Sequence, residues 1–286
     1  MTTTQPPATL APVSTADRGL RHELRAARVV WQRDLIRFRT DRSRIISSFV
    51  QPLLFLFVLG KGLGASIGAG ALAGADYSTF LFPGVLATSV MFTAVFSAIS
   101  IVWDRELGFL REMLVAPISR ISIVLGKCLG GASVATLQAL VLLALAGLVG
   151  VPYSPPMLIG CVALLFLIAF AITAFGLVLA VRVQQIHTVM PRVQLLLTPL
   201  MFLSGAFFPL NGALPGWLHA LTLANPLSYG VDAPRRLVLH YTSGGAEATA
   251  LHWGDRIVPV WLDLTLVIGA GGLLLGLAAW LFSRTD

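Results

Sequence analysis

The stretch Asp104–Lys127, DRELGFLREMLVAPISRISIVLGK, carries seven charged residues among its twenty-four and lies between two long apolar runs. A segment with this many charges does not lie in hydrocarbon, where each charged side chain is costly. It is also too rich in apolar residues to be a plain linker. We therefore expect a docking segment at a membrane surface, connecting two spans.

The composition agrees with a membrane protein. The chain has 286 residues, of which 56% are hydrophobic and 12% charged, whereas soluble domains have about 25% charged residues. Its mean hydropathy is +0.84. Several uncharged windows reach the length of about 18 residues that a helix needs to cross a bilayer. They are apolar all round rather than alternating, which disfavours a β-barrel. The predicted fold class is an all-α polytopic membrane protein.

Six transmembrane helices are predicted from the apolar runs. The first contains Pro52, which membrane helices tolerate when a neighbour satisfies the freed carbonyl. The expected spans are 45–59, 79–103, 128–151, 157–181, 193–207 and 260–282.

The residues before the first span divide into two parts. Residues 1–17 are rich in Thr, Pro and Ala, and we expect a disordered tail. Residues 18–44 hold nine arginines and a helical apolar stripe, which predicts an amphipathic helix in the membrane interface on the cytoplasmic side. It serves as a basic anchor or as an elbow that also touches a partner. The stripe comprises Leu20, Leu24, Ala27, Trp31, Leu35 and Phe38.

Between the fifth and sixth spans, residues 208–259 are apolar but broken by Pro209, Pro215 and Pro226. Pieces of this length are too short to span and predict re-entrant or interfacial half-helices.

The basic residues predict an orientation. With the N-terminus inside, cytoplasmic segments hold sixteen Lys and Arg and external segments hold four. This bias favours both termini in the cytoplasm. Segment 104–127 is then cytoplasmic and 208–259 external, in a multi-pass protein of the cytoplasmic membrane. Topology explains the net charge of +7 better than nucleic-acid binding does.

Motifs for nucleotide or metal chemistry are missing from the sequence. There is no G-x-x-x-x-G-K-[ST] loop, no HExxH, no GxSxG and no Cys/His set with metal-ligand spacing. We therefore expect a non-enzymatic chain with no cofactor of its own. The spans hold one carboxylate, Asp263, near the start of the last. Coupling to protons or sodium is disfavoured, since such transporters keep titratable groups at membrane depth.

Residues 104–114 plot as a short amphipathic helix with an apolar arc of roughly 160°. Asp104 is its candidate N-cap, and Glu106 is the one charge within the apolar arc. Pro117 ends the helix, and Ser119 is a candidate cap for the next one. Such a helix between two spans fits a partner's groove and transmits force to both spans.

Three motifs carry a family resemblance. They are D-R-E-x-G-x-L-R-E-M-L-x-x-P-I-S-R followed by L-G-K, F-L-S-G-A-F-F-P-L at 202–210, and N-P-L-S-Y-G-V-D-A-x-R at 225–235. In content, order and spacing the chain resembles type-2 ABC export permeases over roughly residues 20–284, and within them daunorubicin-type drug-efflux and nodulation-type permeases. Pro234 before Arg235 departs from the pattern and puts the local helix in doubt.

The resemblance implies a domain at 45–284 that pairs with a second permease, as a homodimer or heterodimer, and binds two copies of an ABC ATP-binding subunit. That subunit would hold the ATP and magnesium. Coupling to it would use Asp104, Arg105, Glu106, Gly108, Arg111, Glu112 and Pro117. The basic helix at 18–44 would be the connecting helix. An external gate would include Pro209, Asn225, Pro226 and Tyr229.

The expected function is ATP-driven export of a hydrophobic or amphipathic molecule, such as a drug, an antibiotic or a lipid. The pathway is expected at the dimer interface between the second and fifth spans, lined by Phe92, Phe96, Phe202 and Phe207. One alternative is export of a polysaccharide or lipid-linked glycan on the same fold, using modest polar groups such as Thr93 and Gln138. The other is a channel or membrane enzyme that works without ATP.

Overall fold

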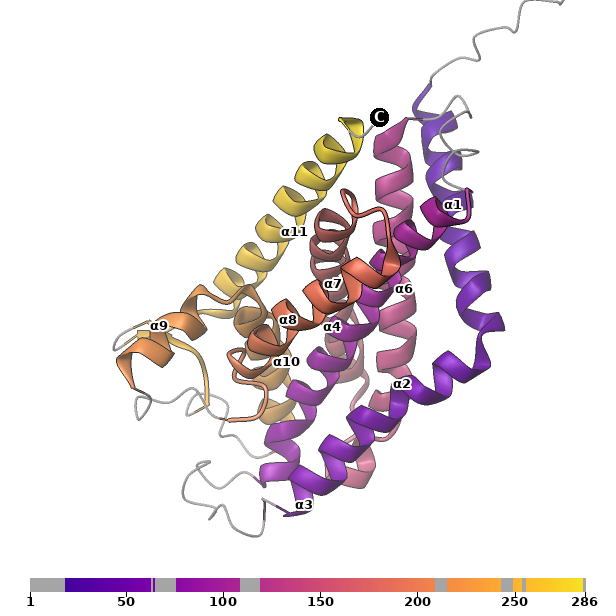
Figure 1. Cartoon of the computed structure of the whole chain (residues 1–286). Coiled ribbons are helices and arrows are strands. Elements are labelled where there is room, and N and C mark those ends of the chain that lie inside the picture. Colours follow the sequence, from indigo (N-terminus) through magenta and orange to yellow (C-terminus); the bar gives the residue numbers. More distant parts are fainter. Residues whose placement is uncertain are drawn as a thin grey trace, which may run out of the picture.

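The computed structural model describes residues 19–62, 64, 76–108, 119–208, 215–242, 249–253 and 256–284, except the side chains of 42–44. This part of the chain is a bundle of helices with one two-stranded hairpin (Figure 1). Its helices are α1 (Leu20–Thr40), α2 (Arg42–Leu54), α3 (Gly60–Gly62), α4 (Tyr77–Glu106), α6 (Arg120–Leu143), α7 (Pro155–Ala180), α8 (Ile186–Phe202), α9 (Gly216–Ala224), α10 (Pro226–Thr242) and α11 (Val260–Ser283). A π-helical segment, Phe55–Leu59, joins α2 to α3, and a 3₁₀ turn, Ala146–Val149, follows α6.

Among the described residues, five helices are long and apolar enough to cross a membrane: Ile45–Gly62, Tyr77–Glu106, Arg120–Leu143, Pro155–Ala180 and Val260–Ser283. These confirm an all-α polytopic membrane protein. The fifth predicted span, 193–207, is different. The helix there, α8, has 17 residues, contains Pro191 and Pro199, and begins already at Ile186.

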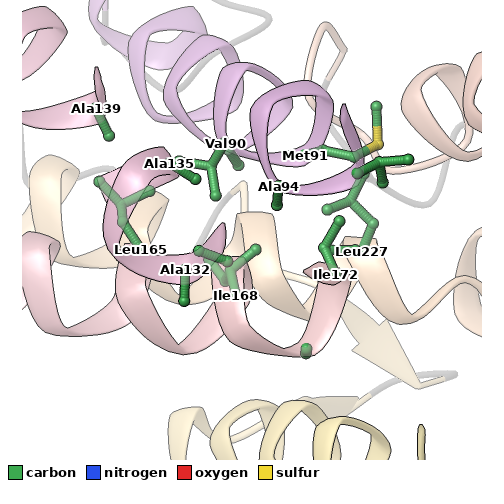
Figure 2. Packing of buried hydrophobic residues seen from close by; sticks show 14 of the residues in the cluster. Val90, Met91, Ala94, Ala132, Ala135, Ala139, Leu165, Ile168, Ile172 and Leu227 are labelled. Carbon is green, nitrogen blue, oxygen red and sulfur yellow. The ribbon is translucent and has the colours of Figure 1, made fainter. Parts of the chain in front are cut away.

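The core is built around α4, which is buried along nearly its whole length. Figure 2 shows how its Val90, Met91 and Ala94 meet side chains from α6, α7 and α10. Alanines dominate the α6 side of this contact. Small side chains let membrane helices approach closely, which lets dispersion and interhelical hydrogen bonds hold the helices together.

Two glycines mark the closest approaches in the core. A Cβ at Gly131 of α6 would lie 2.5 Å from Thr173 of α7, and one at Gly176 of α7 would lie 2.7 Å from Ala98 of α4. Neither position has room for a larger residue. The three helices α4, α6 and α7 therefore form one tightly packed unit.

The helix ends follow from local sequence. Ser119 caps α6, as expected, because its side chain accepts a hydrogen bond from the Ser122 N–H. Pro155 and Pro156 begin α7, where a missing N–H has no cost. Beyond α4, Gly108 adopts a left-handed φ of 81°, a conformation that glycine favours and that ends helices.

Pro52 lies inside α2, and the structure shows how its cost is met. Because proline has no N–H, the Ser48 carbonyl loses its helical donor. The Gln138 side chain of α6 donates to that carbonyl at 3.1 Å. The Gln138 carbonyl oxygen in turn accepts from Thr93 of α4. This buried network ties the outlying α2 to the core.

The segment between α8 and α11 is broken into short pieces, as its prolines predict. It contains α9, α10 and a hairpin of β1 (His252–Trp253) and β2 (Arg256–Ile257), in which His252 pairs with Ile257. The hairpin was not anticipated. In contrast to the doubt raised by Pro234, α10 continues through it from Pro226 to Thr242.

Candidate functional site at the end of α4

The last turn of α4 connects this helix to several other elements. Asp104, Arg105 and Glu106 are consecutive, and their side chains reach four different neighbours. Asp104 meets α1 and α6, Arg105 meets the loop after α7, and Glu106 meets the start of α8. We call these three residues the α4 junction.

Asp104 lies in a buried ion-pair cluster. Its carboxylate is 2.5 Å from the Arg33 guanidinium, 2.8 Å from the Lys127 ammonium and 3.6 Å from the Arg37 guanidinium. The Arg37 guanidinium also lies 5.4 Å from the centre of the Trp103 ring. Three cations thus surround this carboxylate, and two of them, Arg33 and Lys127, also lie within 3.7 Å of Asp34. An unpaired charge in such a site would cost several kcal/mol.

Lys127 is the central cation of the cluster, with a side chain that is 0% exposed. Its ammonium donates to Asp34 at 3.1 Å and to the Ser100 hydroxyl at 2.9 Å, in addition to Asp104. A lysine this deeply buried is held by full pairing. It links α1, α4 and α6 through one nitrogen atom.

Arg105 and Glu106 hold the connection between α7 and α8. Arg105 donates to the Val183 carbonyl at 2.8 Å. The Glu106 carboxylate accepts from the Ile186 N–H at 2.8 Å. Ile186 is the first residue of α8, where N–H groups lack helical partners and the helix dipole favours a negative charge. Glu106 therefore caps α8 from another helix.

A second contact joins α1 to the start of α6. The Glu23 carboxylate accepts from the backbone and hydroxyl of Ser119, at 3.0 and 2.5 Å, and from the Ser122 hydroxyl at 2.6 Å. These hydrogen bonds, the Ser119 hydroxyl first, hold the pKa of Glu23 below its ordinary value. Ser119 is the first described residue after Gly108, so this contact holds the start of α6 against α1.

Glycines allow α1 to approach α6 this closely. A Cβ at Gly126 would lie 2.7 Å from the Ala27 carbonyl oxygen, and one at Gly130 would lie 2.9 Å from the Asp34 carboxylate. The two helices run in the same direction along this contact. The structure thus places α1 lengthwise against α6, with the helix predicted at 18–44 present as Leu20–Thr40.

The structure corrects one prediction about Asp104. It does not cap a separate helix over 104–114, because it lies in the last turn of α4, and Gly108 ends the helical path just beyond Glu106. Burial in the ion-pair cluster holds it there, so its carboxylate is not free for a partner. Arg111, Glu112 and Pro117 lie outside the described residues.

Sequence reasoning missed Glu23, Asp34 and Lys127 as a set. A signal was present: Glu23 and Asp34 are two acids, three helical turns apart, in a strongly basic helix. They share a face with Ala27 and Val30, which are 4% and 5% exposed. The predicted apolar stripe begins instead with Leu20 and Leu24, which are 81% and 60% exposed.

At the opposite end of α4, the second and third motifs come together. The buried Arg235 guanidinium donates to the Gly205 and Ala206 carbonyls at 2.8 and 3.1 Å and lies 4.1 Å from the centre of the Phe80 ring. Asp232 pairs with Arg236 at 2.5 Å, and Asp263, near the start of α11, is 0% exposed. The motif at 225–235 therefore holds α10 against the segment after α8.

Three of the predicted gate residues hold α9 and α10. Asn225 caps α10 by accepting from the Leu227 N–H at 3.0 Å, and its amide donates to Leu200 at 2.8 Å. Pro226 occupies the first position of α10. The Tyr229 hydroxyl donates to the Leu223 carbonyl at 2.8 Å. Pro209 lies outside the described residues.

The four predicted pathway phenylalanines form two pairs rather than one cluster. Phe92 and Phe96 on α4 have ring centroids 6.5 Å apart, and Phe202 and Phe207 are 5.9 Å apart. Phe55, which the sequence did not single out, connects them. It lines the same cavity as Phe92 and Phe96, and its ring meets Phe207 edge-on at 5.2 Å.

Five candidate spans around a buried core, with a charged junction at the end of one span, define a multi-pass membrane protein. Comparison with known families makes this specific: residues 25–239 match the family model for the ABC-2 type transporter. The chain belongs to this family of transport permeases.

Similar proteins bear related names. Nodulation protein J of Sinorhizobium fredii is 29% identical over 243 residues, which cover 84% of this chain and 90% of that protein. Nodulation protein J of Rhizobium meliloti is 28% identical, covering 83% and 91%. Putative transport permease ycf38 of Cyanophora paradoxa is 29% identical over 214 residues, covering 74% and 73%.

Proposed function

We propose that this chain is the membrane subunit of an ATP-driven exporter that moves hydrophobic or amphipathic molecules outward. In this proposal two copies of an ABC ATP-binding subunit dock at segment 104–127, and a second permease completes the pathway. ATP and magnesium are bound and used in the partner subunits. The family, which implies an ATP-binding partner, supports this assignment.

The observation that carries the proposal is the α4 junction. A partner that moves residues 109–118 pulls on α4 through Glu106 and Gly108, and on α6 through Ser119. The junction passes that displacement to α1 and α6 through Asp104, and to α8 through Glu106. A local push therefore becomes a movement of several helices.

In this mechanism Arg111, Glu112 and Pro117 belong to the surface that faces the ATPase. The segment containing Asn225, Pro226 and Tyr229 forms the external gate. Its contacts with Leu200 and Leu223 tie α8, α9 and α10 to one another. A displacement of α8 at the junction therefore reaches the gate through the length of one helix.

We further propose that both termini lie in the cytoplasm. The excess of basic residues supports this orientation. The ends of the described chain also lie together: Arg120 donates to the Ser283 carbonyl at 2.8 Å, and Glu23 binds Ser119 (Figure 1).

Single cysteines test the orientation. The native Cys128 and Cys161 are buried, so they give little background labelling. Lys61→Cys and Gln185→Cys replace exposed residues. An impermeant maleimide added to whole cells should label position 61 and label position 185 only after lysis. Labelling of position 185 in intact cells would contradict the proposed orientation.

The function itself is tested by co-expression with the ABC ATP-binding subunit. The two chains should purify as a complex, and proteoliposomes should accumulate an amphipathic dye only when ATP is supplied on the docking side. The matched control is a complex whose ATPase cannot hydrolyse ATP. If the chain purifies alone and conducts ions without ATP, the proposal fails.

A further inference from the structure

A cavity of about 230 Å³ opens between α2, α4 and α6, with Phe38 of α1 at one edge. It is separate from the ion-pair cluster. On α4 its lining runs from Thr88 to Phe96, which is eight to sixteen residues before Asp104. At 1.5 Å per residue this places the cavity about 12–24 Å along α4 from the cluster, well within the span.

The lining combines two kinds of side chain. Four phenylalanines (Phe38, Phe55, Phe92 and Phe96) contribute apolar ring surface. Seven other lining residues carry a hydroxyl or an amide, and Gln51 is the most exposed of the amides. Among the described side chains that line the cavity, none is ionisable.

The hydroxyl groups are oriented by the helices. Ser89 donates to the Val85 carbonyl at 2.7 Å, so its oxygen lone pairs remain able to accept from a ligand. Gln51 offers both a donor and an acceptor. A charged ligand would lose its hydration here without an opposite charge to replace it. The site therefore suits uncharged hydrogen-bonding groups.

The cavity is large enough for part of a ligand but small for a whole drug-sized molecule. Sites for whole drug-sized ligands usually have about 300–1,000 Å³. The neighbouring face of α2 and of the π-helical segment after it is apolar and open: Val50, Leu54 and Val58 are 52%, 54% and 61% exposed. An apolar tail can lie along this face in lipid while a head group occupies the cavity.

We propose that this cavity binds the head group of an uncharged amphiphile, one whose head bears hydroxyl or amide groups, as in a neutral glycolipid. The apolar tail lies against α2. The inference rests on the proposed export function for the step that releases the molecule, but the binding step stands on the cavity alone. It favours a glycan-bearing lipid over a cationic drug as the transported class.

Photolabelling of the full chain in nanodiscs tests the binding step without ATP or a partner. Three probes share one diazirine-bearing alkyl tail and differ in the head: a glucoside, a trimethylammonium and a sulfonate. The glucoside should label peptides of α2 and α4 at concentrations about tenfold lower than the charged probes. Equal labelling by all three would overturn the proposal.

Variants locate the site. Gln51→Leu should weaken glucoside labelling about fivefold to tenfold, the effect of losing one hydrogen bond. The matched control, Gln194→Leu on α8, should leave it unchanged. Gln51→Glu should raise labelling by the trimethylammonium probe about tenfold, because it supplies the missing charge. If Gln51→Leu and Gln194→Leu label alike, the cavity is not the site.

A separate experiment distinguishes an exported ligand from a resident membrane lipid. When the ATP-binding subunit and ATP are added, an exported molecule should leave the cavity, and labelling should fall. A resident membrane lipid should stay, and labelling should persist. Both results support the head-group site, and only the first also supports export. Failure of export therefore remains distinguishable from failure of binding.

Discussion

Replacing Lys127 by methionine probes the ion-pair cluster directly. Methionine keeps the unbranched apolar stem and removes the ammonium group, which contacts Asp34, Asp104 and Ser100 within 3.1 Å. The side chains of Asp34 and Asp104 are only 5% and 3% exposed. The substitution therefore removes one cationic partner from each of two buried carboxylates.

Breaking a buried ion pair in this way costs about 3–5 kcal/mol. The unfolding equilibrium constant should therefore rise by a factor of roughly a hundred to several thousand. The assay is SDS-driven unfolding in mixed micelles, followed by tryptophan fluorescence. The matched control, Lys61→Met, removes an exposed lysine at the other end of the bundle, and should change the free energy of unfolding by at most about 0.5 kcal/mol.

A double variant separates the charge from the packing. Removing both charges of a buried pair is often nearly neutral. Asp34→Asn combined with Lys127→Met should therefore be more stable than Lys127→Met alone. The reasoning is refuted if Lys127→Met unfolds at the same SDS concentration as Lys61→Met. It is also refuted if the losses of unfolding free energy caused by Asp34→Asn and by Lys127→Met add up in the double variant.

Three further outcomes are expected. Gly126→Ala should destabilise the fold by about 1–3 kcal/mol in the same SDS assay because its Cβ meets the α1 backbone, whereas Gly272→Ala, with open space around it, should be neutral or stabilising. The depressed pKa of Glu23 means that its carboxylate stabilises the fold above pH 4.5 and stops doing so as the pH falls through the folded pKa; the Tm difference between wild type and Glu23→Gln should shrink over that range, and a constant difference would contradict this. Gln138→Leu should lower the free energy of unfolding by about 1–3 kcal/mol because the Ser48 carbonyl loses its donor. Adding Pro52→Ala to that variant should recover part of the loss, since alanine restores a backbone donor. If nothing is recovered, the unpaired Ser48 carbonyl is not the cause of the loss.

The sequence predicted the features that depend on composition and length. The span around α4 was expected at 79–103 and is Tyr77–Glu106, because its apolar run is long and uncharged. The cap at Ser119 and the broken segment after α8 follow from short-range rules for hydroxyl residues and proline. These features depend on few residues that are close in sequence.

The features that were missed depend on which face of a helix meets protein and which meets lipid. Hydrophobicity cannot separate the two, since lipid is as apolar as the core. On α1, Leu20 and Leu24 of the predicted stripe are exposed, while Val30 and Asp34, which lie off that stripe, are buried. The residues that pair with Asp104 are about 20 to 70 positions away in the sequence. The charge pattern of segment 104–127 does not reveal them, and on that pattern alone Asp104 was predicted to lie at the surface.

Glu106 provides the most direct test of the central claim, that the end of α4 transmits the action of the ATPase to the other helices. The measurement is the number of molecules transported per ATP hydrolysed by the reconstituted complex. Glu106→Ala removes the acceptor for the Ile186 N–H, whereas Glu106→Gln keeps one. Asp76→Ala removes an exposed acid at the opposite end of α4 as the control.

The account predicts that Glu106→Ala assembles and hydrolyses ATP within about twofold of wild type but transports roughly tenfold fewer molecules per ATP, the effect of one charge-assisted hydrogen bond. Glu106→Gln should retain most of the coupling, and Asp76→Ala all of it. Transport per ATP by Glu106→Ala equal to that of wild type would contradict the claim.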